Sequence, residues 1–450
     1  MERAQYAFFW GCQIPARLPQ MEKSTRLVLE RLGVKAVDLD GFTCCPERNL
    51  IANLDERAWY LTASRNLAVA ERAGLNLLTS CNGCYGTLKS VLNLVRSDPA
   101  RKAEINRALA KVGLTLEGRV EVRHLIEALY LDVGPERIAK QVSRPLRGMV
   151  IAVHPGCHLI RPSHALQFDD PLEPTKYDAL VEALGAQSLK YDTKMQCCGG
   201  ALANVGELDE AVALAQRKLL NVRDRGADAL TTCCPECFLQ FDQKQTIMQR
   251  RGDNVHLPVL TYPELLGLAL GISPEELGLG AHRVAVGPFL ERWEERQRDL
   301  GAVAGRVDLA AAERCHKCAA CVVDCPVAQS HEDFDPNALI GQFVQGKINE
   351  LLEAGRFWQC LECHTCFELC PQRFGMERVF TALKHLAIER HQIPGGVQIG
   401  LGMFVKSGRL GEPDARARRK LGLAEPPAAG AEELRRLLAG ETPGPKEEEA

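Results

Sequence analysis

The sequence predicts an α/β protein whose first part is duplicated and whose second part is mostly helical. Three observations predict this fold class. Short apolar runs alternate with helical patterns up to about residue 290. Groups of cysteines occur twice in the same order within that region, and a tighter cysteine spacing occurs twice after residue 310. The chain has 450 residues, which is more than one simple domain usually holds.

Composition narrows the classes of protein that the chain can be. The formal net charge is −3, so no basic excess points to nucleic acid or to an anionic membrane. Hydrophobic residues make up 46% and charged residues 25%, an ordinary balance for a globular protein. The most apolar stretch, residues 265–272, is too short to span a membrane, and no export signal opens the chain. We therefore expect a cytoplasmic protein without a membrane span.

Alternation of strands and helices organises the first part. A helix is predicted at Glu22–Leu32, where apolar residues recur at helical spacing. Strands are predicted at the short apolar runs 6–10, 37–39, 75–78, 149–153, 188–191 and 229–230. This order implies parallel strands joined by crossover helices. Each cysteine group then follows the carboxyl end of a strand, the edge at which ligands bind in open α/β sheets.

The cysteines of the first part repeat as a lone cysteine, a Cys-Cys pair and a Cys-x-x-Cys motif. The flanking sequence repeats too, since residues 73–80 before Cys81 resemble residues 225–232 before Cys233. The first copy contains Cys12, Cys44, Cys45, Cys81 and Cys84, and the second contains Cys157, Cys197, Cys198, Cys234 and Cys237. Five thiolates exceed the four ligands of a zinc site, so each half is expected to hold an iron–sulfur cluster of unusual shape.

The second part carries the bacterial ferredoxin spacing twice. The two runs are Cys315, Cys318, Cys321 and Cys325, followed by proline, and Cys360, Cys363, Cys366 and Cys370, again followed by proline. In such pairs the fourth cysteine of each run ligates the other cluster. We therefore assign Cys370 to the first [4Fe–4S] cluster and Cys325 to the second. The segment between the runs contains a predicted helix at Ala338–Ala354 and favours a helical two-cluster domain.

Around the cysteines, the first part carries six short motifs, at residues 6–12, 22–26, 80–84, 155–159, 195–199 and 239–242. On these motifs, residues 1 to about 290 resemble the B-type subunit of heterodisulfide reductase, a protein with two CCG domains. The first Cys-Cys pair is followed by Pro46 where the second is followed by Gly199, a departure that leaves every ligand in place. Residues 291–405 look like the two-cluster C-type subunit, so the chain resembles a B–C fusion.

The resemblance implies a function and a set of partners. Each five-cysteine motif would hold a non-cubane [4Fe–4S] cluster, and a small disulfide or thiol substrate would bind between the two. Two cubane [4Fe–4S] clusters would relay electrons from a flavin- and iron–sulfur-containing A-type subunit within a multi-subunit complex. The sequence contains neither a P-loop nor a convincing dinucleotide fingerprint, which also indicates a separate electron donor.

The expected domains are 1–145 and 146–290 for the two CCG repeats, 291–405 for the ferredoxin domain, and 406–450 for a mostly disordered tail. The tail is rich in Pro, Ala, Glu and Arg, with a basic run at 416–420, a helical turn predicted at 434–438 and an acidic run at 447–449.

Other interpretations stay open at this point. The chain could be the iron–sulfur electron-transfer subunit of a flavin-dependent hydroxy-acid or glycerol-3-phosphate dehydrogenase complex, although in those proteins the ferredoxin part comes first. It could also be an electron-transfer protein without catalytic activity or a zinc-stabilised scaffold.

The roles of some individual residues also stay open. Cys233 is either a small buried residue or an alternative ligand to Cys234. His154 and His158 either donate protons or hydrogen-bond near a cluster, and Lys194 either attracts an anionic substrate or is solvated.

Overall fold

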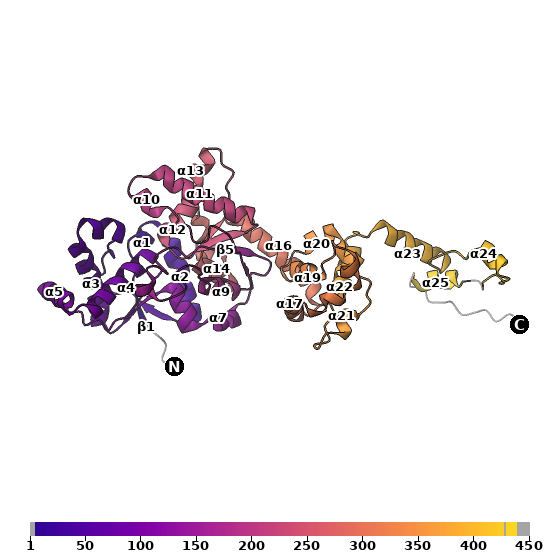
Figure 1. The fold of residues 1–450 in the computed structure, drawn as a ribbon, viewed down its shortest axis with the longest axis horizontal. Coiled ribbons are helices and arrows are strands. Elements are labelled where there is room, and N and C mark those ends of the chain that lie inside the picture. The colour runs from indigo at the N-terminus through magenta and orange to yellow at the C-terminus, as the bar shows by residue number, and fades with distance from the viewer. Residues whose placement is uncertain (1–4, 427–428, 439–450) are drawn as a thin grey trace. The chain divides into compact units, whose positions relative to one another are not determined.

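The computed structural model describes residues 5–426 and 429–438 and divides the chain into two compact units. The first unit is Met1–Arg298 and the second is Asp299–Ala450. All eight strands of the described residues belong to the first unit, in two sheets of four parallel strands each. The duplicated α/β fold followed by a ferredoxin-type helical domain is therefore confirmed (Figure 1).

The two sheets have the same topology, with strand orders β2-β1-β3-β4 and β6-β5-β7-β8. The strands of the first sheet are β1 (Gln5–Phe8), β2 (Lys35–Val37), β3 (Asn76–Thr79) and β4 (Val122–His124). Those of the second sheet are β5 (Val150–Val153), β6 (Gln187–Ser188), β7 (Ala229–Thr232) and β8 (Val259–Thr261). The central strands β1, β3, β5 and β7 are buried except for the first residues of β1 and β3, as expected for parallel sheets covered on both faces.

Helices connect the strands in each half. The first half contains α1 (Gln13–Arg17), α2 (Pro19–Leu32), α3 (Glu56–Arg72), α4 (Asn82–Ser97), α5 (Pro99–Leu109), α6 (Leu125–Ala128) and α7 (Pro135–Gln141). The second contains α8 (Ser163–Leu166), α9 (Lys176–Glu182), α10 (Gly200–Asn204), α11 (Leu208–Asp224), α12 (Pro235–Phe238), α13 (Gln245–Arg250), α14 (Tyr262–Ala269) and α15 (Pro274–Leu277). Helix α16 (Gly287–Ala304) includes the boundary between the units.

Local sequence explains where the main helices begin and end. Pro19 occupies the first turn of α2, where its missing N–H costs nothing, and Gly33 ends that helix with a φ of 70°. Asp55 caps α3 by accepting a hydrogen bond from the Ala58 N–H at 2.9 Å. The predicted helix at Glu22–Leu32 is α2, which begins three residues earlier, at Pro19.

The strand registers align the two halves more closely than the sequence repeat does. Thr79 pairs with His124 in the first sheet, and Thr232 pairs with Thr261 at the same place in the second. Cys81 and Cys234 therefore correspond, and Ser80 corresponds to Cys233. The prediction that matched residue 80 with 232 is displaced by one residue, because the second half has one more residue before this strand. Strands β4 and β8 were not predicted.

The regular secondary structure of the second unit, among its described residues, is entirely helical. Its helices are α17 (Leu309–Cys318), α18 (Pro326–Ser330), α19 (Pro336–Val344), α20 (Ile348–Ala354), α21 (Thr365–Glu368), α22 (Glu377–Glu389), α23 (Gly395–Ser407), α24 (Ala415–Lys420) and α25 (Ala431–Leu438). The single helix predicted at Ala338–Ala354 is wrong: α19 and α20 are separate, because Gly346 between them has a φ of 72°.

The C-terminal segment contains short helices among its described residues. Helix α24 carries the basic run, and α25 covers and extends the turn predicted at 434–438. The acidic run at 447–449 lies outside the described residues, and disorder of the tail stays a prediction. Across the ranges that the structure describes, no helix is both long and apolar enough to cross a bilayer.

Asp228 joins the second sheet to α16. Its buried carboxylate accepts hydrogen bonds from the Val150 N–H at 2.7 Å, from Arg292 at 2.6 Å and from Arg296 at 2.8 Å. Replacing Asp228 with alanine leaves the buried Val150 N–H without an acceptor and the largely buried Arg296 without its carboxylate partner, so we expect the first unit to lose about 3 kcal/mol of unfolding free energy. Urea unfolding followed by circular dichroism measures this loss.

Asp224→Ala is the control for that substitution, because Asp224 is exposed and pairs with its neighbour Arg223. It should cost less than about 1 kcal/mol. Equal effects of the two substitutions would show that the contacts of Asp228 do not hold α16 to the sheet.

Candidate metal centres

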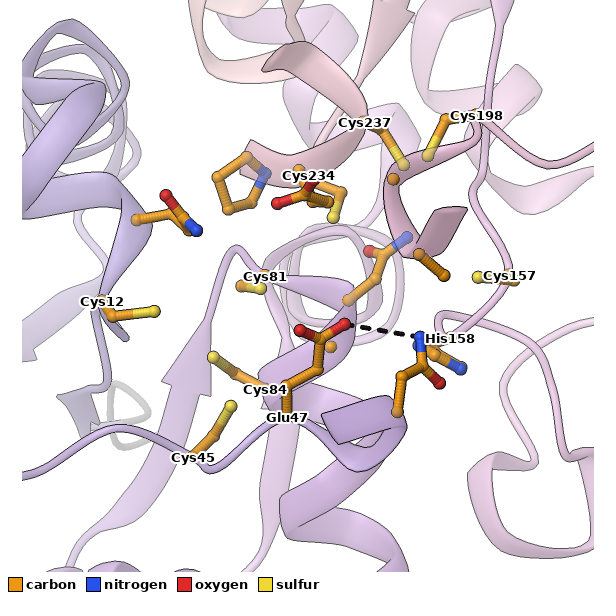
Figure 2. A pocket seen from close by; sticks show the side chains of 18 of the residues that line it. Cys12, Cys45, Glu47, Cys81, Cys84, Cys157, His158, Cys198, Cys234 and Cys237 are labelled. Carbon is orange, nitrogen blue, oxygen red and sulfur yellow. Dashed lines mark hydrogen bonds between the residues drawn. The ribbon is translucent and has the colours of Figure 1, made fainter. Parts of the chain in front are cut away.

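One cavity in the first unit brings the cysteines of both halves together. Strands β1, β3, β5 and β7 end near it, so the loops that follow them carry the cysteines to one place. Its volume is about 110 Å³. The cavity is lined by all ten predicted cysteines: Cys12, Cys44, Cys45, Cys81, Cys84, Cys157, Cys197, Cys198, Cys234 and Cys237. Figure 2 shows labelled cysteines of the two halves around this space.

Most equivalent cysteines of the two halves have the same degree of burial. The lone cysteine and the first member of each Cys-Cys pair are exposed, and the second member of each pair is buried. The Cys-x-x-Cys motifs lie at the start of α4 and α12 and are buried except for the half-buried Cys81. Each half therefore presents five sulfurs that run from the protein interior toward the surface.

Hydrogen bonds between thiols change the acidity of several cysteines. Bonds from Cys44 and Cys84 lower the pKa of Cys45, and bonds from Cys197 and Cys237 lower the pKa of Cys198. The pKa of Cys234 is lowered by bonds from Cys237 and from Cys81 of the other half. The sulfurs thus form a network that crosses between the halves and can release protons when a metal binds.

The two histidines beside Cys157 have different surroundings. His154 is buried, its ring meets Phe241 edge-on at 4.8 Å, and its nearest ring nitrogen lies within 4.8 Å of the sulfurs of Cys198 and Cys237. Within the described part of the chain, neither ring nitrogen of His154 has a hydrogen-bond partner. His158 lines the cavity. His154 therefore lies close to sulfur, and His158 lines the cavity. Whether either histidine donates protons or hydrogen-bonds near a cluster stays a prediction.

The structure places Lys194 and Cys233 away from the cavity wall. The Lys194 ammonium donates to the Pro174 carbonyl at 2.9 Å and to Asp178 at 2.6 Å. Cys233 is buried, and burial raises the pKa of its thiol. Its counterpart Ser80 is also fully buried and also not part of the lining. This equivalence favours the interpretation of Cys233 as a small packed residue.

Two carboxyl groups in the cavity were missed by the sequence analysis. Glu47 follows the first Cys-Cys pair, and Glu236 lies inside the second Cys-x-x-Cys motif. Burial raises the pKa of both, to about 7 for Glu236. Counting from the ligand cysteines, Glu47 corresponds to Gly200 and Glu236 to Gly83. Alignment of the two repeats could have found these acids as the positions at which the halves differ.

A buried lysine binds the backbone just before the second Cys-Cys pair. Lys218 of α11 is fully buried and donates to the carbonyls of Thr193 and, at 3.0 Å, Lys194, three to four residues before the second Cys-Cys pair. Burial lowers its pKa to about 7, although the nearby thiols of Cys237 and Cys198 act in the opposite direction. Asn66 holds the equivalent position on α3, eight residues before the glycine that follows the helix, and donates to the Cys44 carbonyl at 3.1 Å.

The second unit contains two further cavities, each lined by four cysteines. One is lined by Cys315, Cys318, Cys321 and Cys370, and the other by Cys325, Cys360, Cys363 and Cys366. Three cysteines of each cavity come from one run and the fourth comes from the other run. The folded chain therefore brings together the two sets that the sequence analysis assigned to two clusters.

Three residues between these cysteines have an unusual backbone conformation. Ala319, Glu362 and His364 lie between cysteines of the two runs and have φ values of 51°, 52° and 59°. Non-glycine residues rarely adopt this left-handed region, and such residues cluster at functional sites. The buried carboxylate of Glu377 accepts a hydrogen bond from the Cys366 thiol at 2.9 Å.

The donor chemistry of all three cavities fits iron–sulfur clusters. Their inner donors are almost only sulfur, and sets of four or more thiolates select clusters or zinc over oxygen-binding metals. Each of the two cavities in the second unit has the four thiolates that a [4Fe–4S] cluster takes. The first-unit cavity offers five cysteines from each half, more than zinc uses.

Comparison with known protein families agrees with this division of the chain. Residues 6–89 and 151–242 each match the family model of a cysteine-rich domain, called CCG, and residues 311–374 match a 4Fe–4S dicluster domain. A crystal structure of a hypothetical protein from Helicobacter pylori has a similar fold, with a TM-score of 0.52 and 20% sequence identity. The likeness covers 63% of this chain and 52% of that one.

Several curated relatives match one or the other unit. The B-type subunit of a ferredoxin/F420H2-dependent CoB–CoM heterodisulfide reductase from Methanosarcina acetivorans is 41% identical over 291 residues, which cover 64% of this chain and 97% of that protein. An 8-methylmenaquinol:fumarate reductase membrane anchor subunit from Wolinella succinogenes is 32% identical, covering 61% and 95%. A protein from Archaeoglobus profundus that is named as similar to the C-type subunit of heterodisulfide reductase is 32% identical over 131 residues, covering 28% and 70%.

The crossed cysteine sets of the second unit can be tested by removing one fourth cysteine. Cys325→Ala removes a donor from the cavity of the other run, so we expect the purified protein to lose about four iron ions per chain. Electron paramagnetic resonance should show that the remaining cubane belongs to the Cys315 run. Retention of all iron, or loss of the cluster of the Cys315 run instead, would contradict the crossed assignment.

Neighbouring cysteines of the second half provide a matched comparison. Cys234 lines the cavity and Cys233 does not, so Cys234→Ser should lower the iron content while Cys233→Ser leaves it at the wild-type value. Iron analysis of the anaerobically purified variants measures both. Equal iron loss in the two variants would show that Cys233 is a ligand.

Proposed function

Because the chain belongs to the family of the B-type subunits of heterodisulfide reductase and also carries a 4Fe–4S dicluster domain, we propose that it is a B–C fusion subunit that reduces or forms a disulfide. The observation that carries this proposal is the single cavity to which each half contributes five cysteines. A site between two equivalent metal-binding halves can act on two equivalent sulfur atoms. Cleaving one disulfide takes up two electrons and two protons and yields two thiols.

The cysteines divide into four proposed ligand sets. The five of each half would hold one non-cubane [4Fe–4S] cluster, and the two sets of four in the second unit would hold cubane clusters. Bound clusters of this kind supply or accept electrons one at a time. The chain itself contributes the thiolates and the buried Lys218, which donates to backbone carbonyls shortly before the second Cys-Cys pair.

Groups of the cavity wall position the substrate. The side chains of Trp10, Gln13 and Asn82 line it beside the cysteines. Asn82 is itself fixed, because its amide donates to the Pro155 carbonyl at 2.9 Å and so joins α4 to the loop after β5. The Phe8 ring stacks on Trp10 with centroids 3.6 Å apart and the Arg26 guanidinium lies over the Trp10 ring at 4.6 Å, so the edge of the indole, beside sulfur and amide groups, would contact the short carbon chains that flank a small disulfide.

Electron supply requires a partner under this proposal. The two ferredoxin-type sets would pass electrons singly between the first unit and a flavoprotein of the A type. Relatives of the chain are named as subunits of reductases, which supports assembly into a multi-subunit complex. The alternative, an electron-transfer subunit of a hydroxy-acid or glycerol-3-phosphate dehydrogenase complex, is not favoured by these relatives or by the order of the two units.

Iron analysis and spectroscopy test the proposed function directly. Anaerobically purified protein should contain about sixteen iron ions per chain, and oxidation in the presence of a small thiol should produce a new paramagnetic signal. Cys44→Ser and Cys197→Ser should abolish the thiol-dependent signal, whereas Cys325→Ala should leave it. About eight iron ions, with zinc and no effect of thiol, would reduce the first unit to a scaffold and contradict the proposal.

A further inference from the structure

We propose that Lys218 makes the two five-cysteine sites unequal in reduction potential, so that the first electron to enter the first unit resides on the cluster held by the second half. This inference rests on the proposed function, in which each half holds a [4Fe–4S] cluster. It goes further by giving one side chain outside the cavity a role in electron transfer, and by giving an order to the two electrons that cleave a disulfide.

Lys218 is a buried cation without a carboxylate partner. Among the residues that the structure describes, it is the one lysine or arginine that is fully buried. Its ammonium donates to the carbonyls of Thr193 and, at 3.0 Å, Lys194, and lies 5.4 Å from the centre of the Tyr191 ring. Within that part of the chain, no carboxylate forms an ion pair with it. A buried cation without an opposite charge costs free energy, so negative charge close by has to offset that cost.

The cysteines of the second half are the source of this negative charge. Burial lowers the pKa of Lys218, and the thiols of Cys237, Cys198 and Cys197 act in the opposite direction. Coulomb interactions are reciprocal, so the ammonium stabilises negative charge on these sulfurs as much as they stabilise the ammonium. All three cysteines line the cavity and belong to the proposed ligand set of the second half. Because reduction adds one negative charge to a cluster, a buried cation beside its ligands raises its reduction potential.

The first half holds the same stretch of backbone without a buried charge. The carbonyl three residues before the Cys-Cys pair belongs to Lys194 in the second half and to Gly41 in the first. Arg65 donates to the Gly41 carbonyl, but Arg65 is partly exposed, so solvent and salt screen its charge. The place that Lys218 has on α11 is taken on α3 by Asn66, a neutral side chain that also donates to a backbone carbonyl of its loop. The electrostatic difference between the halves is therefore one buried charge.

Unequal potentials give the reaction an order. Cleavage of one disulfide takes up two electrons and two protons and yields two thiols, and ferredoxin-type clusters deliver the electrons one at a time. With Lys218 in place, the first electron resides in the second half and the following one in the first half. The two sulfur atoms of a bound disulfide would therefore meet two sites that differ in electron affinity, even where the disulfide itself is symmetric.

Anaerobic redox titration of the cluster-loaded full chain, followed by electron paramagnetic resonance and Mössbauer spectroscopy, measures the potentials. Titrations at pH 6 keep Lys218 protonated, because burial lowers its pKa only to about 7. We expect two distinct midpoint potentials for the clusters of the first unit. Cys197→Ser should alter the signal with the higher midpoint and Cys44→Ser the signal with the lower one, which assigns each potential to one half.

Substitution of Lys218 identifies the cause of the difference. Lys218→Met removes the charge and keeps the length of the side chain. It should lower the equilibrium constant for one-electron reduction of the second-half cluster about tenfold, which corresponds to about 59 mV, and leave the lower midpoint unchanged. Lys218→Arg keeps the charge and should retain the wild-type potentials. Arg217→Met, which removes an exposed charge from the neighbouring position of α11, is the control and should also retain them.

Asn66→Lys tests the same cause in the opposite direction and does not depend on the folding of Lys218→Met. It introduces a cation at the equivalent position of α3 and should raise the lower midpoint toward the higher one. Equal potentials in the wild-type protein, a higher potential in the first half, or unchanged potentials in Lys218→Met or Asn66→Lys would overturn the inference. Continued reduction of a disulfide in any of these cases would leave the proposed function standing, whereas a first unit that binds no cluster would contradict both.

Discussion

The first unit depends on holding ten cysteine sulfurs in one small space. Thiolates repel one another, and burial of each one costs free energy unless hydrogen bonds or a metal compensate. In the folded chain the sulfurs compensate one another: three cysteines are held at lowered pKa by neighbouring thiols, and the network passes from one half to the other through Cys81 and Cys234. The loops that carry the sulfurs follow strands of two parallel sheets with the same order and register, which fixes where each loop begins.

Duplication supplies the framework, and small differences between the copies give each half its own chemistry. The paired strands end at the same level, as the registers of Thr79 and Thr232 show. Within that common frame, the buried Lys218 stands where the first half has Asn66, and each half carries one acid where the other half has glycine. The two equivalent sets of proposed cysteine ligands thus lie in different electrostatic surroundings, and the cavity that they line is not symmetric.

Much of this arrangement was predictable because it follows from local patterns. The apolar runs locate the main strands, and a cysteine placed after a parallel strand must lie at the ligand-binding edge. Strands β4 and β8 escaped prediction because three residues such as Val122–His124 carry no pattern of their own and become strands only by pairing with β3 and β7. The break at Gly346 escaped because apolar periodicity continues on both sides of it, although the backbone does not.

The acids Glu47 and Glu236 show what a sequence motif leaves out. Each lies within two residues of a predicted ligand, so a search for metal donors passes over them in favour of sulfur. They stand out only when the two halves are aligned, because each acid then corresponds to a glycine in the other half. The cysteine motif is complete with either residue at that position. A residue that differs between two copies of one metal site is free to serve something other than the metal.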